Sequence, residues 1–163
     1  RPGVKRSETA QSIAIDLPDE AATARLARRV ARLLRPGDVV ALHGGLGTGK
    51  TSFARAAIRA LGDDLEVVPS PTFTLAQTYE LPEFTLWHFD LYRIEVPEDA
   101  FELDIEEAFA SGVSLIEWPD RLGQWLPAVR LDIDLVFAGA GRRATISGHG
   151  DWTARLAALD PDD

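Results

Sequence analysis

Glycines, a lysine and a threonine between residues 44 and 51 have the types and the spacing to hold a phosphate group. The sequence Gly44-x-x-x-x-Gly49-Lys50-Thr51 matches the P-loop pattern. Glycines let successive backbone N–H groups turn inward around a phosphate without a clash from a Cβ atom. In this pattern the lysine reaches the β- and γ-phosphates, and the threonine hydroxyl binds Mg²⁺. The expected nucleotide-binding residues of the loop are Gly44, Gly45, Leu46, Gly47, Thr48, Gly49, Lys50, Thr51 and Ser52.

The segments on either side of this loop agree with the motif. The apolar residues 39–43 predict a short buried strand before it. Residues 50–61 predict a helix that begins at the loop and ends at Gly62, and such a helix directs the positive end of its dipole at a bound phosphate. Lys50 is one of only two lysines among 17 basic residues, and its compact ammonium suits a loop that encloses a phosphate.

Two acidic residues at predicted strand ends could serve a metal ion. Asp90 ends the apolar segment "LWHFD", and Glu117 ends "VSLIE". The carboxyl ends of parallel strands form the edge where α/β proteins bind their ligands. One carboxylate would hold Mg²⁺ and the other would orient or deprotonate a water, and the sequence leaves open which does which. The guanine-reading signature Asn/Thr-Lys-x-Asp is absent, so ATP is favoured over GTP.

The three histidines show no metal-binding spacing and no Ser-His-Asp arrangement. His43 and His88 fall within predicted strands and are interpreted as structural. His149, near the end of the chain, is expected to be exposed.

The composition is that of a globular domain, with 163 residues of which 45% are hydrophobic and 26% charged. The absence of cysteine excludes a disulfide framework and suits the cytoplasm, and no apolar run is long enough to predict a membrane span. The net charge of −9 argues against a protein that wraps nucleic acid, DNA included, because such a protein usually needs a basic face. Two charged stretches are interpreted as the solvent-facing sides of amphipathic helices, namely the arginines of residues 25–35 and the seven acidic residues of 95–107.

The pattern of the whole chain predicts one α/β domain. Helices are expected over 19–34 and 50–61, and strands over 39–43, 84–93 and 113–118. Alternating apolar residues in "VRLDIDLVF" and the following "ATISG" predict an antiparallel hairpin. We therefore predict a mostly parallel central sheet with added antiparallel strands over residues 13–150, between a flexible segment 1–12 and a C-terminal tail 151–163.

Four segments together resemble the TsaE family. They are "GGLGTGKTSF", "SPTFTLAQTYE", "HFDLYR" and "LIEWPDR", in the order and at roughly the spacing of that family, and the similarity spans about residues 17–147. The resemblance implies a P-loop NTPase-like three-layer domain. It also implies an ATPase that takes part in the threonylcarbamoyl modification, t(6)A, of the adenosine beside the anticodon in tRNAs reading ANN codons.

The resemblance further implies partners. The ATPase of this family works with TsaD, which carries the transferase site, and with TsaB, the scaffold partner of TsaD. ATP binding and hydrolysis reset the TsaB–TsaD–TsaE complex between turnovers and do not transfer the group, so tRNA would be an indirect partner. An acidic chain suits this division of labour, although the sequence leaves open whether the arginine-rich helix touches tRNA.

Single side chains also take roles from the resemblance. Thr72 in "SPT" matches a switch-like threonine near the γ-phosphate and the metal, and Thr23 matches a position near the adenine. Trp118 matches a tryptophan beside the acidic residue of "EWP", and its role stays open. The catalytic residues implied are Lys50, Thr72, Asp90 and Glu117, and the metal ligands implied are Thr51, Asp90 and Glu117.

Two positions depart from the family pattern. Gly45 stands where the family usually has Asp, in "GDLG", so no role for that carboxylate can be carried over. Asp104 stands where "LG" is common, and it is expected to alter a helix turn and leave the site unchanged.

Two other functions remain compatible with the glycine loop. A P-loop kinase for a small molecule would need a lid with several arginines, whereas residues 62–83 contain none. A nucleotide-dependent binding switch would use the threonine of "SPT" to sense the γ-phosphate, and this overlaps the ATPase interpretation.

Overall fold

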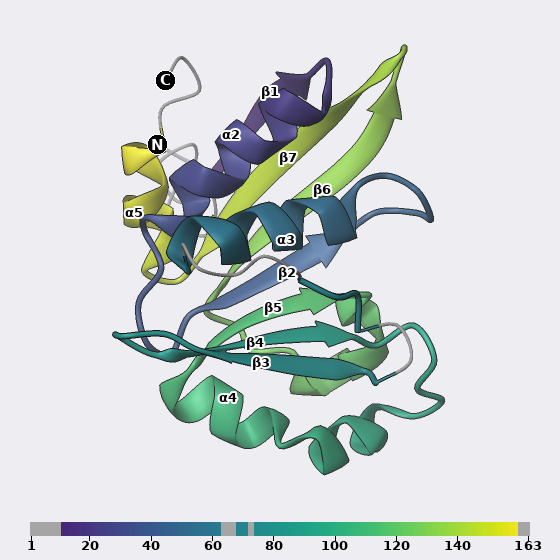
Figure 1. The fold of residues 1–163 in the computed structure, drawn as a ribbon, viewed down its shortest axis with the longest axis vertical. Coiled ribbons are helices and arrows are strands. Elements are labelled where there is room, and N and C mark those ends of the chain that lie inside the picture. Colours follow the sequence, from purple (N-terminus) through teal and green to yellow (C-terminus); the bar gives the residue numbers. More distant parts are fainter. Residues whose placement is uncertain (1–10, 63–67, 72–73, 160–163) are drawn as a thin grey trace, which may run out of the picture.

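The computed structural model describes residues 11–62, 68–71 and 74–159, which form one seven-stranded sheet with helices on both faces (Figure 1). The strands lie in the order β1-β7-β6-β2-β5-β4-β3. Neighbouring strands are parallel in the middle of this order and antiparallel toward both edges. The predicted fold class is therefore confirmed.

Four strands form the parallel centre of the sheet: β2 (Val39–His43), β4 (Thr85–Asp90), β5 (Val113–Glu117) and β6 (Arg130–Ala138). β5 pairs with β2 on one side and with β4 on the other, and β6 pairs with the far side of β2. Helices cover both faces of β2 and β5, which explains why their sequences are apolar almost without interruption. Because the four strands run the same way, their carboxyl ends meet at one edge of the sheet.

The antiparallel strands extend this centre on both sides. β7 (Gly141–His149) returns beside β6 and completes the predicted C-terminal hairpin. The sequence analysis did not predict β1 (Gln11–Leu17), which pairs with β7, or β3 (Ala76–Glu80), which pairs with β4. β1 begins within the segment expected to be flexible, and its apolar side chains Ile15 and Leu17 are buried in the core.

Two long helices pack on one face of the sheet, α2 (Glu20–Ala31) and α3 (Lys50–Leu61), as predicted. α2 begins after Asp19, whose carboxylate accepts a hydrogen bond from the backbone N–H of Ala22 at 2.9 Å. The short helices α5 (Trp152–Arg155) and η3 (Leu156–Ala158) add to the same core. Three residues of the stretch expected to be a tail are buried there: Trp152, Leu156 and Leu159.

The opposite face is covered by η1 (Pro97–Leu103), α4 (Ile105–Ser111) and η2 (Pro119–Trp125). The single acidic helix expected over 95–107 is wrong, because Asp104 interrupts it in the left-handed conformation with φ 60°. Aspartate tolerates this conformation better than most side chains do, and glycine adopts it freely. This accounts for the effect expected of Asp104 on a helix turn.

None of the helices within the described ranges has the length and the apolar character needed to cross a membrane.

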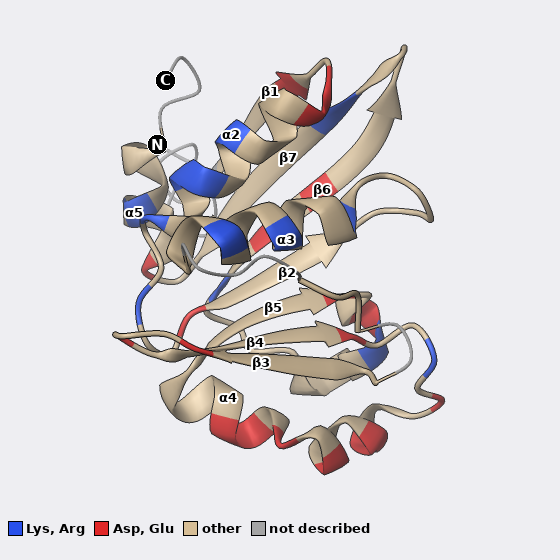
Figure 2. Ribbon diagram, in the orientation of Figure 1, with Lys and Arg blue, Asp and Glu red and all other residues tan. Residues whose placement is uncertain are grey.

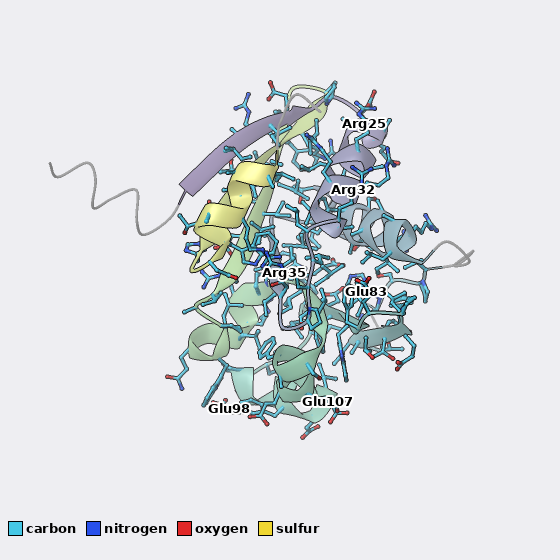
Figure 3. All side chains as sticks on the ribbon, turned by 90° about the vertical axis from the view of Figure 1, so that its left-hand side faces the viewer. Arg25, Arg32, Arg35, Glu83, Glu98 and Glu107 are labelled. Atoms are coloured by element: carbon cyan, nitrogen blue, oxygen red, sulfur yellow. The ribbon has the colours of Figure 1, made fainter. Side chains whose placement is uncertain are left out.

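Two groups of like charge lie toward opposite ends of the molecule. Arginines lie on α2 and α3, whereas the acidic residues of η1 and α4 lie at the other end (Figure 2). Figure 3 shows Arg25 and Arg32 near one end of the long axis, and Glu98 and Glu107 near the opposite end. All four residues are exposed, as the amphipathic pattern predicts.

A cluster of charged residues lies on the sheet at β2, β6 and β7. Asp132 accepts one hydrogen bond from Nε of Arg130 at 2.9 Å, and its carboxylate lies 2.9 Å from His43 Nε2 and 2.8 Å from His149 Nε2. The expectation that His149 is exposed is wrong, because its ring is half-buried against this carboxylate. The hydrogen bond to Asp132 raises the pKa of His43. Burial alone would raise the pKa of Asp132, but hydrogen bonds from His43 and Arg130 lower it to about 2.

This cluster predicts a pH-dependent contribution to stability. Because the pKa of His43 is higher in the folded chain, its contribution is full below the ordinary pKa of 6.5 and is lost as pH rises through the folded value. We expect Asp132→Asn to lower the free energy of unfolding by about 1–3 kcal/mol near pH 5.5, and by less near pH 8.5. Urea unfolding at both pH values measures the difference. Asp16→Asn, which removes an exposed ion pair with Arg143, is the control. An equal loss at both pH values would contradict the prediction.

Candidate functional site

The glycine loop connects the end of β2 to the start of α3, at the edge where the parallel strands end. Three of its glycines have positive φ values: 139° at Gly44, 79° at Gly47 and 107° at Gly49. Gly49 precedes α3 without a side-chain cap, so the first N–H groups of the helix are left for another acceptor. The local geometry is therefore that of an anion-binding loop at a helix N-terminus.

Gly44 and Gly45 are adjacent but differ in what they require. A Cβ atom on Gly44 would lie 2.5 Å from the carbonyl oxygen of Leu135 and 2.6 Å from Oγ1 of Thr48, at a φ that favours glycine. A Cβ atom on Gly45 would meet nothing within 4 Å, and its φ is not positive. The position where this chain departs from the family pattern therefore has room for a side chain.

Lys50 lies inside the loop with 5% of its surface exposed. Its ammonium group donates hydrogen bonds to the carbonyl oxygens of Gly44 at 2.6 Å and Gly45 at 2.8 Å. The same group lies 4.1 Å from the centre of the Trp118 ring, within the range of a cation–π interaction. Burial lowers the pKa of Lys50, while the carboxylates of Glu117 and Asp90 act in the opposite direction.

The two predicted acidic residues lie beside each other at the strand ends. Asp90 and Glu117 are partners in the parallel register of β4 and β5, and both are buried. The hydroxyl of Thr51 donates to the Glu117 carboxylate, with distances of 2.8 Å to Oε1 and 3.0 Å to Oε2. Asp90 Oδ1 accepts a hydrogen bond from the backbone N–H of Tyr92 at 3.1 Å. Thus Glu117 is joined to the loop threonine.

His88 also contacts this carboxylate. Its Nε2 lies 2.7 Å from Oε2 of Glu117, and the histidine side chain is fully buried. The sequence analysis interpreted His88 only as structural. A signal was present in "HFD", because residues two apart on a strand share a face and His88 therefore lies on the same face as Asp90.

Two adjoining pockets bring the predicted residues together. The first, of about 400 Å³, is lined by loop residues together with Asp90, Tyr92, Arg93, Glu117 and Trp118. The second, of about 240 Å³, lies on the other side of Gly49 and Ser52 and is lined by Thr23, Thr48 and Arg142, among others. Thr23 is thus separated from the acidic residues by the loop. Thr72 lies outside the described residues.

Arg142 is a residue of the site that the sequence analysis missed. From the start of β7, its guanidinium donates to the carbonyl oxygens of Thr48 at 3.2 Å and Gly47 at 3.1 Å. It also lies 4.4 Å from the centre of the Phe137 ring on β6. Arg142 therefore tethers the glycine loop through two of its backbone carbonyl groups. No sequence signal marks this residue, because only the position of the hairpin beside β2 brings it to the loop.

Comparison with known proteins gives a consistent result. Residues 17–145 match the family model described as "Threonylcarbamoyl adenosine biosynthesis protein TsaE". The chain is 40% identical over 119 residues to a protein of Rickettsia bellii named tRNA threonylcarbamoyladenosine biosynthesis protein TsaE, covering 73% of this chain and 83% of that protein. It is 38% identical over 127 residues to the protein of the same name from Bacillus subtilis, covering 77% of each. The crystal structure of Bacillus subtilis YdiB superposes with a TM-score of 0.72 at 28% identity, over 91% of this chain and 93% of that one.

The contrast between the two adjacent glycines can be tested by stability. We expect Gly44→Ala to lower the free energy of unfolding by about 2–4 kcal/mol, because the methyl group meets backbone at a strained φ. Gly45→Ala is the matched control and should change it by less than about 0.5 kcal/mol. Urea unfolding of both variants measures the difference. Equal effects of the two substitutions would contradict the difference in space between the two positions.

Proposed function

This chain belongs to the TsaE family, and we propose that it is the ATP-binding and ATP-hydrolysing subunit of a tRNA-modifying complex. The family is involved in threonylcarbamoyladenosine biosynthesis in tRNA. The single observation that carries the ATPase assignment is the meeting of Lys50, Thr51, Asp90 and Glu117 at one pocket beside the glycine loop. A lysine, a hydroxyl and two carboxylates at a helix N-terminus are the groups that P-loop phosphoryl chemistry requires.

ATP binding would use both pockets. The loop N–H groups and the first turn of α3 would receive the phosphates, with the Lys50 ammonium leaving its loop carbonyls for the β- and γ-phosphates. The adenine would occupy the second pocket, beside Thr23. Arg142 supports this arrangement, because a loop already tethered by its carbonyl groups loses less conformational freedom when a ligand binds.

The donor atoms at the strand ends fit Mg²⁺. A hydroxyl has one proton and two lone pairs, so Thr51 can donate to Glu117 and still offer a lone pair to a metal ion. Mg²⁺ prefers oxygen ligands and commonly takes one or two from the protein beside the phosphates of its substrate. We assign Thr51 and Glu117 to the metal side of the pocket and Asp90 to the orientation of the attacking water. Bound Mg²⁺ would neutralise charge that develops on the phosphates.

The role in the complex would be to reset it rather than to transfer the threonylcarbamoyl group. The partners in this proposal are homologues of TsaB and TsaD in the cytoplasm. The chain would act on tRNA indirectly, through these partners. The exposed acidic residues of η1 and α4 support an indirect role, because they would repel tRNA from that end of the molecule (Figure 2). The proposal also predicts slow hydrolysis by the chain alone, since a site completed by a partner lacks some of its groups in isolation.

Substitutions in the pocket should separate binding from hydrolysis. Lys50→Ala removes the cation that meets the phosphates, so ATP affinity should fall about tenfold or more and hydrolysis should be lost. Glu117→Gln keeps the shape of the side chain but removes its charge from the metal side of the pocket. We expect affinity without Mg²⁺ to change little, the affinity gained on adding Mg²⁺ to fall about tenfold or more, and hydrolysis to fall about 100-fold. Calorimetric titration with ATP measures the affinity, and the release of phosphate measures the rate of hydrolysis. Glu80→Gln is a matched control, because Glu80 also ends a strand but lies at the opposite edge of the sheet. Hydrolysis at the wild-type rate by Lys50→Ala would overturn the site.

The partner proposal is tested by hydrolysis in the presence of TsaB and TsaD from the same organism, without tRNA. The pair should form a complex with this chain and raise its slow rate by about tenfold or more, because the partners complete the site. The Lys50→Ala variant in the same mixture should show no increase. If the wild-type rate is unchanged and no complex forms, the partner assignment is refuted. The nucleotide site is tested independently by the ATP titrations of the chain alone.

A further inference from the structure

A buried hydrogen bond ties the site to the interior of the sheet. His88 Nε2 lies 2.7 Å from Glu117 Oε2, with the histidine side chain 0% exposed and the glutamate side chain 3% exposed. A short contact between an imidazole N–H and a carboxylate is stronger in a buried environment of low dielectric than at a surface. The bond is therefore strong enough to restrict the glutamate side chain.

The hydrogen-bonding pattern determines which nitrogen carries the proton. Within the described residues, the other ring nitrogen, Nδ1, is buried and has no hydrogen-bond partner. A buried N–H without an acceptor costs more than an unpaired acceptor nitrogen, so we infer the tautomer with hydrogen on Nε2. In this tautomer His88 donates to the Glu117 carboxylate.

The position of His88 is fixed by the sheet rather than by a loop. In the parallel register of β4 and β5, His88 is the partner of Leu115, two residues before Glu117 on the same face. The histidine thus reaches diagonally across one strand pair, from a side-chain position that is fully buried. The Glu117 carboxylate is held between a donor in the sheet and the Thr51 hydroxyl at the start of α3.

We propose that His88 is a positioning residue for the metal-binding carboxylate of this site. This inference rests on the proposed ATPase function. By donating a hydrogen bond to Oε2, His88 fixes the orientation of the Glu117 carboxylate. In that orientation Glu117 accepts a hydrogen bond from the Thr51 hydroxyl, and the lone pairs of the hydroxyl would then face the metal. His88 itself does not meet the nucleotide. Groups that orient metal ligands in this way commonly change metal affinity or activity by about 10- to 100-fold when they are removed.

The test compares replacements of His88 that differ in reach. His88→Gln places an amide N–H where Nε2 lies, whereas His88→Asn places its amide where Nδ1 lies and cannot reach Glu117. His88→Leu removes all donors. In EDTA we expect the leucine and asparagine variants to bind ADP as the wild type does. The increase in ADP affinity on adding Mg²⁺ should be about tenfold smaller in these variants than in the wild type. Their hydrolysis of ATP should fall about 10- to 100-fold, and His88→Gln should restore most of both.

A matched control separates this role from a purely structural one. Leu86→Ala removes a buried side chain two residues earlier on the same face of β4, away from Glu117. If it lowers the Mg²⁺-dependent gain as much as His88→Leu does, or if the glutamine and asparagine variants behave alike, the proposal is overturned. The comparison of His88→Gln with His88→Asn remains decisive even if His88→Leu does not fold. A wild-type chain that binds no ADP or ATP would overturn the proposed function instead.

Discussion

The parallel pairing of β5 with β2 and β4 is the constraint on which the site depends. In this register Glu117 is the partner of Leu42 in β2 and of Asp90 in β4, so three strands end at one level. The glycine loop begins where β2 ends, and α3, which follows the loop, packs on one face of the sheet. A shift of one residue in any of the three strands would turn its terminal side chain to the other face of the sheet. The loop, the lysine and the two carboxylates meet because this register is fixed by buried apolar side chains on both faces.

The polar groups buried in this molecule are concentrated around the two pockets. Among the described residues, the buried polar or charged side chains are Thr23, Thr48, Lys50, His88, Asp90, Ser114 and Glu117. All except Ser114 line one of the pockets or contact Glu117. Burying ionised groups is unfavourable unless they are paired, and here the lysine lies among loop carbonyls and the glutamate between two donors. Such a concentration of unfavourable burial is expected at a functional site rather than in a structural core.

The antiparallel hairpin supports the site from the other side of β2. It brings Arg142 to the carbonyl groups of the glycine loop, and it brings Asp132 beside His43, the last residue of β2 before that loop. Both contacts join β6 and β7 to the segment that would receive the phosphates. The hairpin therefore contributes more than an extension of the sheet, because it restrains both the start of the loop and its middle.

Features that depend on neighbouring residues can be predicted from the amino-acid sequence. The glycine loop, the strand before it, the helix after it and the hairpin follow from local spacing and periodicity, and four ordered segments were enough to indicate the family. Local pattern did not reveal β1, β3 or the burial of Trp152, because partners distant in the sequence stabilise each of them. It placed Asp90 and Glu117 at strand ends but did not distinguish their roles. The contacts of Glu117 with Thr51 and His88, and those of Arg142 with the loop, become visible only in the folded chain. Those contacts are set by which strands are neighbours and in what register, and no short stretch of the chain encodes that information.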